Sequence, residues 1–154
     1  MSDDLKFRVW CCDRNEWERD ECTLHPDGNV IHFTSQGIPT LLRANSHIVE
    51  RCVGIADRSH NLFYTGDIVE VEMMCDNTSD VTEGFSRVEE HEDGAVYRFT
   101  RIRGVVEWRN TGFFIKLIER TTNFGADFYD YMGDKFSWQQ LEIVGNIHEN
   151  PEFL

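Results

Sequence analysis

The sequence predicts a mainly β fold, with one domain over residues 1–154, one short helix and an acidic insertion at about 76–94. Three observations lead to this prediction. Segments in which apolar and polar residues alternate recur along the chain, and turn-forming Gly, Asn and Asp residues separate them. At 154 residues, the chain is also long enough to bury a core without disulfides.

Residues 102–119 predict the β-hairpin around which this domain is organised. One face of its first strand is apolar and the other is mainly charged, because side chains alternate between the faces of a strand. The apolar face contains Ile102, Val106 and Trp108, and the opposite face contains Arg103, Val105, Glu107 and Arg109. Asn110-Thr111-Gly112 predicts the turn. The returning strand is expected to bury Phe113, Ile115 and Leu117.

The remaining elements follow from the same patterns. Further strands are predicted over residues 5–11, 30–33, 48–55, 68–74, 95–100 and 142–147, and turns over 25–29, 35–37 and 65–67. Residues 13–21 predict an exposed connecting segment, and residues 135–141 predict one or two helical turns near Trp138. Asp67 is expected to accept hydrogen bonds from nearby backbone amides. Gly145, inside the last strand, predicts a bulge or a close backbone approach.

The charge of the chain is concentrated in one segment. The net charge is −13, and residues 67–94 hold ten acidic residues and one basic residue. Residues 76–94 are expected to be flexible or partly ordered. A dense array of carboxylates can occupy a basic groove as phosphates do, whereas the competing interpretation is a solvated loop. The candidate partner-binding residues are Asp76, Asp80, Glu83, Glu89, Glu90, Glu92 and Asp93.

An alternative site lies on the central strand. Arg101, Arg103 and Arg109 share one strand face and lie near Trp108 in sequence, and small barrels with basic and aromatic side chains bind single-stranded nucleic acid. The net charge of −13 opposes this interpretation, because it repels phosphate. The competing interpretation is that these arginines balance Glu107 and the acidic segment.

The sequence predicts neither catalysis nor a cofactor. Five cysteines, an odd number, without an export signal indicate reduced thiols in a cytoplasmic protein, and no apolar run is long enough to cross a membrane. Cys22 and His25 have half of a zinc-site spacing, but no second pair matches them, so no metal is predicted. Cys52 with His47 or His60 lacks the glycine turn that would mark a nucleophile, so the chain is not expected to be an enzyme.

Four segments together resemble the YopX family of phage and prophage proteins. They are residues 6–10, residues 53–58 with 64–69, residues 104–108 with Gly112-Phe113, and the C-terminal run Glu142-Ile-Val-Gly-Asn-Ile-His-Glu-Asn-Pro-Glu-Phe-Leu154. The resemblance implies a mainly β fold with a small, partly open SH3-like barrel, and no assigned catalytic residues. The chain departs from the family pattern at 52–54, where Cys-Val-Gly replaces Tyr-Thr-Gly, and at 57–60, where Asp-Arg-Ser-His replaces Asp-x-Asn-Gly. A third departure is the segment 76–94, which is longer and more acidic than is common in the family.

The resulting expectation is a non-enzymatic accessory protein of a phage or prophage that acts by binding in the cytoplasm of the host. Its expected partner is a host or phage protein with a basic surface, such as a nucleic-acid-binding or defence protein that it inhibits. The alternative is a nucleic-acid-associated module. No membrane association is expected, and exposed strand edges permit homo-oligomers.

Overall fold

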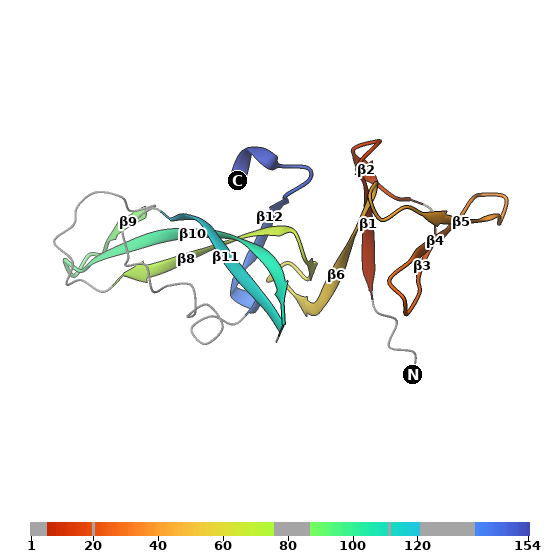
Figure 1. Cartoon of the computed structure of the whole chain (residues 1–154). Coiled ribbons are helices and arrows are strands. Elements are labelled where there is room, and N and C mark those ends of the chain that lie inside the picture. Colours follow the sequence, from red (N-terminus) through yellow and green to blue (C-terminus); the bar gives the residue numbers. More distant parts are fainter. Residues whose placement is uncertain (1–5, 20, 76–86, 111, 121–137) are drawn as a thin grey trace. The chain divides into compact units, whose positions relative to one another are not determined.

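The computed structural model describes residues 6–19, 21–75, 87–110, 112–120 and 138–154, and these residues are mainly β (Figure 1). The strands are β1 (Phe7–Cys11), β2 (Glu16–Trp17), β3 (Cys22–Leu24), β4 (Val30–Phe33), β5 (Pro39–Leu42), β6 (His47–Ala56), β7 (Leu62–Tyr64), β8 (Asp67–Cys75), β9 (Arg87–Glu90), β10 (Val96–Arg109), β11 (Gly112–Arg120) and β12 (Glu142–Asn146). Short 3₁₀ helices lie at η2 (Trp138–Gln140) and η3 (Pro151–Phe153). The predicted mainly β fold is confirmed, and of the helix predicted over 135–141 the described residues show the 3₁₀ helix η2, whereas η3 was not predicted. None of the described helices is long and apolar enough to span a membrane.

The chain divides into two compact units, Met1–Cys52 and Val53–Leu154. Strand β6 contributes residues to both units. The single domain over residues 1–154 stays a prediction.

In the first unit, β1 lies between β2 and β6 in one sheet. Its residues Val9, Trp10 and Cys11 are at most 4% exposed. Trp17 of β2 pairs with Trp10, and their rings pack edge to face with centroids 4.9 Å apart. The exposed connecting segment predicted over 13–21 is therefore wrong at β2, because Trp17 joins the packing around β1.

The second sheet of this unit is formed by β3, β4 and β5. The predicted turns on both sides of β4 are confirmed, with Gly28 at φ +88° and Gly37 at φ +74°. Strand β3 was not predicted, because three residues are too few to show an alternating pattern. Leu41 of β5 and Ile38 before it remain 60% and 55% exposed.

In the second unit, β10 runs through the sheet β11-β10-β8-β12 and is 14 residues long (Figure 1). The core cluster consists of Phe63, Val69, Val71, Ile102, Val106, Ile115 and Leu141. Phe113 and Leu117 pack against this cluster. The apolar faces predicted for the central hairpin are thus confirmed except at Trp108, which is 50% exposed, and Val105 of the opposite face is buried as well.

Strand β10 is longer than the separate strands predicted over 95–100 and 102–109. Its first residues, Val96 to Phe99, pair with Glu90 to Arg87 of β9, so part of the predicted acidic insertion is an ordered β-hairpin. We call residues 87–99 the acidic hairpin. Residues 76–86 lie outside the described residues.

Two glycines allow close backbone packing in the second unit. The β12–β8 register shifts between Ile143 and Gly145, which confirms the predicted bulge, and a Cβ on Gly145 would lie 2.5 Å from Oδ1 of the Asn150 side chain. Gly104 lies at a second register shift, on β10, where a Cβ would lie 2.7 Å from the carbonyl oxygen of Lys116.

Candidate functional site

The acidic hairpin carries four of the predicted partner-binding residues, two at the end of β9 and two on the turn that follows. Glu90, Glu92 and Asp93 are exposed, and Glu89 is half-buried. Gly94 adopts φ +84°, and Asp93 Oδ1 accepts a hydrogen bond from the Ala95 amide at 3.0 Å. The turn is closed by the His91 amide, which donates to the Ala95 carbonyl at 2.8 Å. The other predicted residues, Asp76, Asp80 and Glu83, lie outside the described residues.

Arg87 anchors this hairpin to the rest of the sheet. Its guanidinium lies 3.9 Å from the ring centroid of Phe99 and 3.1 Å from Glu72 Oε2 on β8, and it also pairs with Glu89. Cation–π contact and ion pairing therefore hold β9 against β10 and β8. Because Arg87 partly neutralises Glu89, the displayed negative charge is concentrated on Glu90, Glu92 and Asp93.

The arginines predicted to bind nucleic acid form ion pairs within the sheet. Arg103 donates to Glu70 Oε2 from Nε at 3.2 Å and from Nη2 at 2.9 Å, and Arg101 Nε lies 3.1 Å from Glu70 Oε1. The Arg103 guanidinium also lies 4.6 Å from the ring centroid of Phe153. Both arginines would have to turn N–H donors away from the Glu70 carboxylate in order to bind a phosphate.

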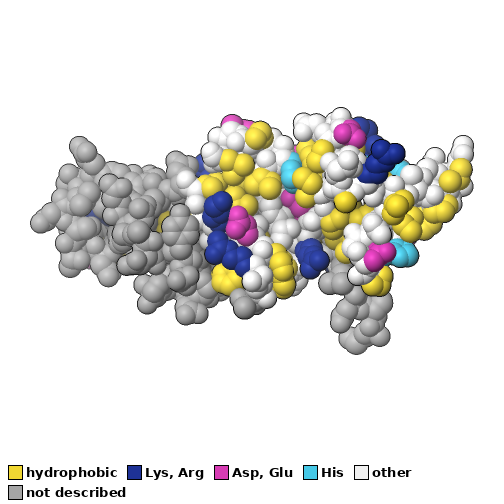
Figure 2. Space-filling model, viewed as in Figure 1, with side chains coloured by type: hydrophobic (Ala, Val, Ile, Leu, Met, Phe, Trp, Pro, Cys, Tyr) yellow, Lys and Arg dark blue, Asp and Glu magenta, His cyan; other side chains and the backbone are white. Residues whose placement is uncertain are grey.

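Arg109 and Trp108 lie on opposite faces of β10. Arg109 Nη2 lies 3.6 Å from Glu107 Oε2, whereas the Trp108 ring packs edge to face on Phe113 with centroids 4.8 Å apart. Phe113 packs against the core, so Trp108 does not share the arginine face. On the face seen in Figure 2, basic and acidic side chains lie beside one another. Nucleic-acid binding by Arg101, Arg103, Trp108 and Arg109 stays a prediction.

A cluster of potentially metal-binding side chains lies in the first unit. Cys11, Glu18 and His47 each offer one ligand atom, and the three atoms lie within 4.8 Å of one another. The backbone holds these residues in place, because Cys11 pairs with His47 across β1 and β6 and the Glu18 amide donates to the Val9 carbonyl at 2.8 Å. Cys11 is 2% exposed, and the side chains of Glu18 and His47 are 4% and 12% exposed.

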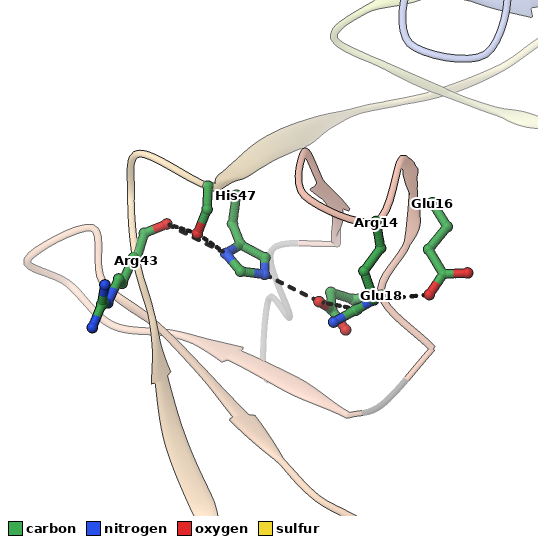
Figure 3. A network of polar contacts seen from close by, with 6 residues as sticks. Arg14, Glu16, Glu18, Arg43 and His47 are labelled. Atoms are coloured by element: carbon green, nitrogen blue, oxygen red, sulfur yellow. Dashed lines mark hydrogen bonds and ion pairs between the residues drawn. The ribbon is translucent and has the colours of Figure 1, made fainter.

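Polar contacts fix the orientation of Glu18 and His47 in this cluster (Figure 3). His47 Nε2 lies 3.1 Å from Glu18 Oε1, and His47 Nδ1 lies 2.9 Å from Ser46 Oγ and 3.3 Å from the Arg43 carbonyl oxygen. Arg14 Nη2 donates to Glu18 Oε1 at 2.5 Å. The cluster thus combines a buried thiol, an imidazole and a carboxylate.

Sequence reasoning did not find this cluster. The sequence suggests instead Cys22 with His25, and Cys52 with His47 or His60. Among the residues that the structure describes, the metal-capable group of three contains His47 but not Cys22, His25, Cys52 or His60. The signal that could have found it is the pairing of Cys11 with His47, which depends on the β1–β6 register.

Residues of the family pattern hold the turns of the second unit together. The buried Asp67 carboxylate accepts hydrogen bonds from the Tyr64 amide at 2.7 Å and from Asn146 Nδ2 at 3.4 Å. Asn146 Oδ1 in turn accepts from the His148 amide at 2.9 Å. The predicted role of Asp67 as an acceptor for backbone amides is confirmed, and its contacts join the start of β8 to the end of β12.

Asp57 organises the turn at which the chain departs from the family pattern. Its buried carboxylate accepts hydrogen bonds from the amides of Ser59, Asn61 and Ile143 and from Asn61 Nδ2. Burial raises the pKa of Asp57, but the hydrogen bonds outweigh burial and lower this pKa below its usual value. His60 occupies the glycine position of the pattern with φ +68°, a conformation that costs a non-glycine residue free energy.

We expect Asp57→Asn to lower the free energy of unfolding by about 1–3 kcal/mol at pH 7, because the new amide group cannot accept all of these hydrogen bonds. The folded pKa is below the unfolded value of about 3.9, so the stabilisation is present above that pH and is lost as the pH falls through the folded pKa. Urea unfolding at pH 7 and pH 3 should show the difference from the native protein shrinking at pH 3. The exposed Asp13→Asn should change stability by under ~0.5 kcal/mol at pH 7. An Asp57→Asn difference that is equal at both pH values would contradict this account.

Comparison with known proteins places the chain in a family and supports its fold. The family model described as YopX protein matches residues 6–154, which confirms the resemblance seen in the sequence. The chain is also similar to a solved structure, the crystal structure of protein EF1440 from Enterococcus faecalis. The two share 16% sequence identity with a TM-score of 0.52, over 97% of this chain and 96% of that chain. This likeness shows the fold alone, a mainly β chain. Comparison with curated proteins gives no match.

Proposed function

We propose, from the premise that this chain belongs to the YopX family, that it is a non-enzymatic protein that acts by binding a basic protein through the acidic hairpin. The observation that carries the proposal is the position of Glu90, Glu92 and Asp93. Glu92 and Asp93 are exposed on the hydrogen-bonded turn between β9 and β10, and Glu90 is exposed at the end of β9 beside that turn.

The hairpin geometry favours binding over simple solvation. Pairing of β9 with β10 and the Arg87–Phe99 contact hold the backbone that carries the carboxylates. Less conformational entropy is then lost when a partner binds, which improves affinity for a given set of contacts. Complementary charge also accelerates encounter with a basic partner and selects against acidic ones.

A basic surface that accepts a row of carboxylates is also a surface that accepts phosphates. The proposed partner is therefore a nucleic-acid-binding or defence protein of the host, whose nucleic-acid site the acidic hairpin blocks. The proposal also includes the setting that the sequence resemblance implied: a phage or prophage accessory protein with an SH3-like barrel that works in the cytoplasm of its host.

The alternative function is direct binding of nucleic acid by the arginine face of β10. Arg101, Arg103 and Arg109 share that face, which favours the alternative, but contacts with Glu70 and Glu107 oppose it. If this alternative holds, the pure protein should bind single-stranded DNA or RNA at ~50 mM salt and release it at ~200 mM salt. If the protein acts instead through the acidic hairpin, the pure protein should not bind single-stranded DNA or RNA.

We expect the native protein to displace fluorescent DNA from at least one member of a panel of purified bacterial DNA-binding proteins and nucleases. Neutralising the hairpin with Glu90→Gln, Glu92→Gln and Asp93→Asn should weaken displacement at least ~10-fold, because the complementary charge is lost. Asn at position 93 keeps the oxygen that accepts from Ala95.

The matched control carries Asp13→Asn, Glu21→Gln and Glu149→Gln, which remove the same charge from exposed positions elsewhere. This control should displace DNA as well as the native protein does. Equal losses in both triple variants would show a nonspecific charge effect and would contradict the proposal, as would failure to displace DNA from every member of the panel.

A further inference from the structure

We infer that Cys11, Glu18 and His47 form a binding site for a zinc ion, with a fourth position open to water. The three residues supply a thiolate, a carboxylate and an imidazole, all of which are zinc ligands. Three protein ligands with an open position are the composition of zinc sites that bind a further small ligand. This site lies within the first unit and is separate from the acidic hairpin.

The spacing of the three donors suits zinc after small side-chain rotations. Zinc bonds of about 2.0–2.3 Å in a tetrahedral site place the donor atoms about 3.3–3.8 Å apart. The three donors already lie within 4.8 Å of one another, and His47 Nε2 and Glu18 Oε1 are 3.1 Å apart. The β1–β6 pairing supports two of the donors on rigid backbone.

The surroundings of His47 are a second, independent observation. Metal-binding histidines usually donate a hydrogen bond from the ring nitrogen that does not bind the metal, often to a backbone carbonyl. His47 Nδ1 lies 3.3 Å from the Arg43 carbonyl oxygen and 2.9 Å from Ser46 Oγ. When Nδ1 donates to that carbonyl, the lone pair of Nε2 points toward Glu18, and a cation between them removes the repulsion.

Arg14 is the cation that occupies this region in the structure. Its guanidinium donates to Glu18 Oε1 at 2.5 Å and to Glu16 Oε1 at 2.9 Å, and its side chain is 51% exposed. Zinc binding would compete with this ion pair for Glu18, and the exposed Arg14 side chain can move toward solvent. Cys11 releases its proton when it binds the metal.

The test uses the full chain and measures the binding of zinc by calorimetry and of cobalt by its thiolate absorption. We expect one zinc per chain with a Kd below ~10 µM and a cobalt–thiolate band in the native protein. Cys11→Ser should abolish the band, and Glu18→Gln and His47→Gln should each weaken zinc binding at least ~10-fold. The exposed neighbour supplies the control, since Cys12→Ser should leave both signals unchanged.

Arg14→Gln separates a metal site from a merely structural network. Removing the competing guanidinium should tighten zinc binding severalfold, whereas a network without a metal site gives no such gain. Circular dichroism will show whether each variant is folded, and Glu18→Gln tests the site if Cys11→Ser does not fold. The inference is overturned if the native protein shows no cobalt–thiolate band, or if Cys12→Ser loses as much of this band as Cys11→Ser does. It is also overturned if Arg14→Gln binds zinc more weakly than the native protein.

Discussion

Replacing Phe63 with Ala is expected to lower the free energy of unfolding of the second unit by about 3–5 kcal/mol. Phe63 is fully buried in the core cluster, and its ring packs edge to face on Trp138 with centroids 5.3 Å apart. The variant loses the buried apolar surface and this ring contact, and it leaves a cavity that the surrounding strands fill only in part. Urea unfolding followed by far-ultraviolet circular dichroism measures the loss.

Two variants serve as controls for Phe63→Ala. Phe63→Leu keeps most of the side-chain volume and should cost less than the alanine variant. Phe33 lies on β4 of the first unit and is 36% exposed, so Phe33→Ala should cost under ~1.5 kcal/mol. If Phe63→Ala lowers the free energy of unfolding no more than Phe33→Ala does, the placement of Phe63 in the core is contradicted.

Gly104→Ala is expected to lower the free energy of unfolding by about 2–3 kcal/mol, although it adds one methyl group. That Cβ would lie 2.5 Å from Ile115 Cγ2 and 2.7 Å from the carbonyl oxygen of Lys116. The Ile115 side chain can rotate, but the carbonyl can move only by distorting the β10–β11 pairing. Thermal and urea unfolding together measure the effect.

Gly94 offers a comparison in which the cause of strain is different. A Cβ there meets nothing within 4 Å, but φ is +84°, so Gly94→Ala is expected to cost about 1 kcal/mol through backbone strain alone. The steric cost at Gly104 should exceed the conformational cost at Gly94. A Gly104→Ala protein as stable as the native protein would show that β10 and β11 pack differently from the structure.

Local sequence patterns predicted the parts of the fold that local chemistry determines. Most inward-facing residues of β10 and β11 follow from alternation. The role of Asp67 follows from the hydrogen-bonding capacity of its carboxylate, and that of Gly145 from its lack of a side chain. Strands β2 and β3 are too short for alternation to be visible. Strand β9 was missed because its composition resembles that of a solvated loop, whereas Arg87 is held by Phe99 and Glu72, which are distant in sequence.

The candidate sites were less predictable, because they depend on contacts across strands. The sequence showed that Arg101 and Arg103 share a face, but their shared partner Glu70 comes from β8. Likewise, Cys11 and His47 meet only through the β1–β6 register, and no local spacing encodes that contact. Composition identifies the acidic residues, and the structure adds that Glu90 ends β9 and that Glu92 and Asp93 lie on the turn after it.

The central claim is that the acidic hairpin is the surface that binds the partner. The most direct test is amide hydrogen exchange of the full chain, alone and in complex with the basic protein that it displaces from DNA. The account predicts slower amide exchange over residues 87–99 in the complex. Exchange over residues 101–109, which carry the arginines of β10, should stay unchanged. Slower exchange confined to other segments, with residues 87–99 exchanging as in the unbound chain, would contradict it.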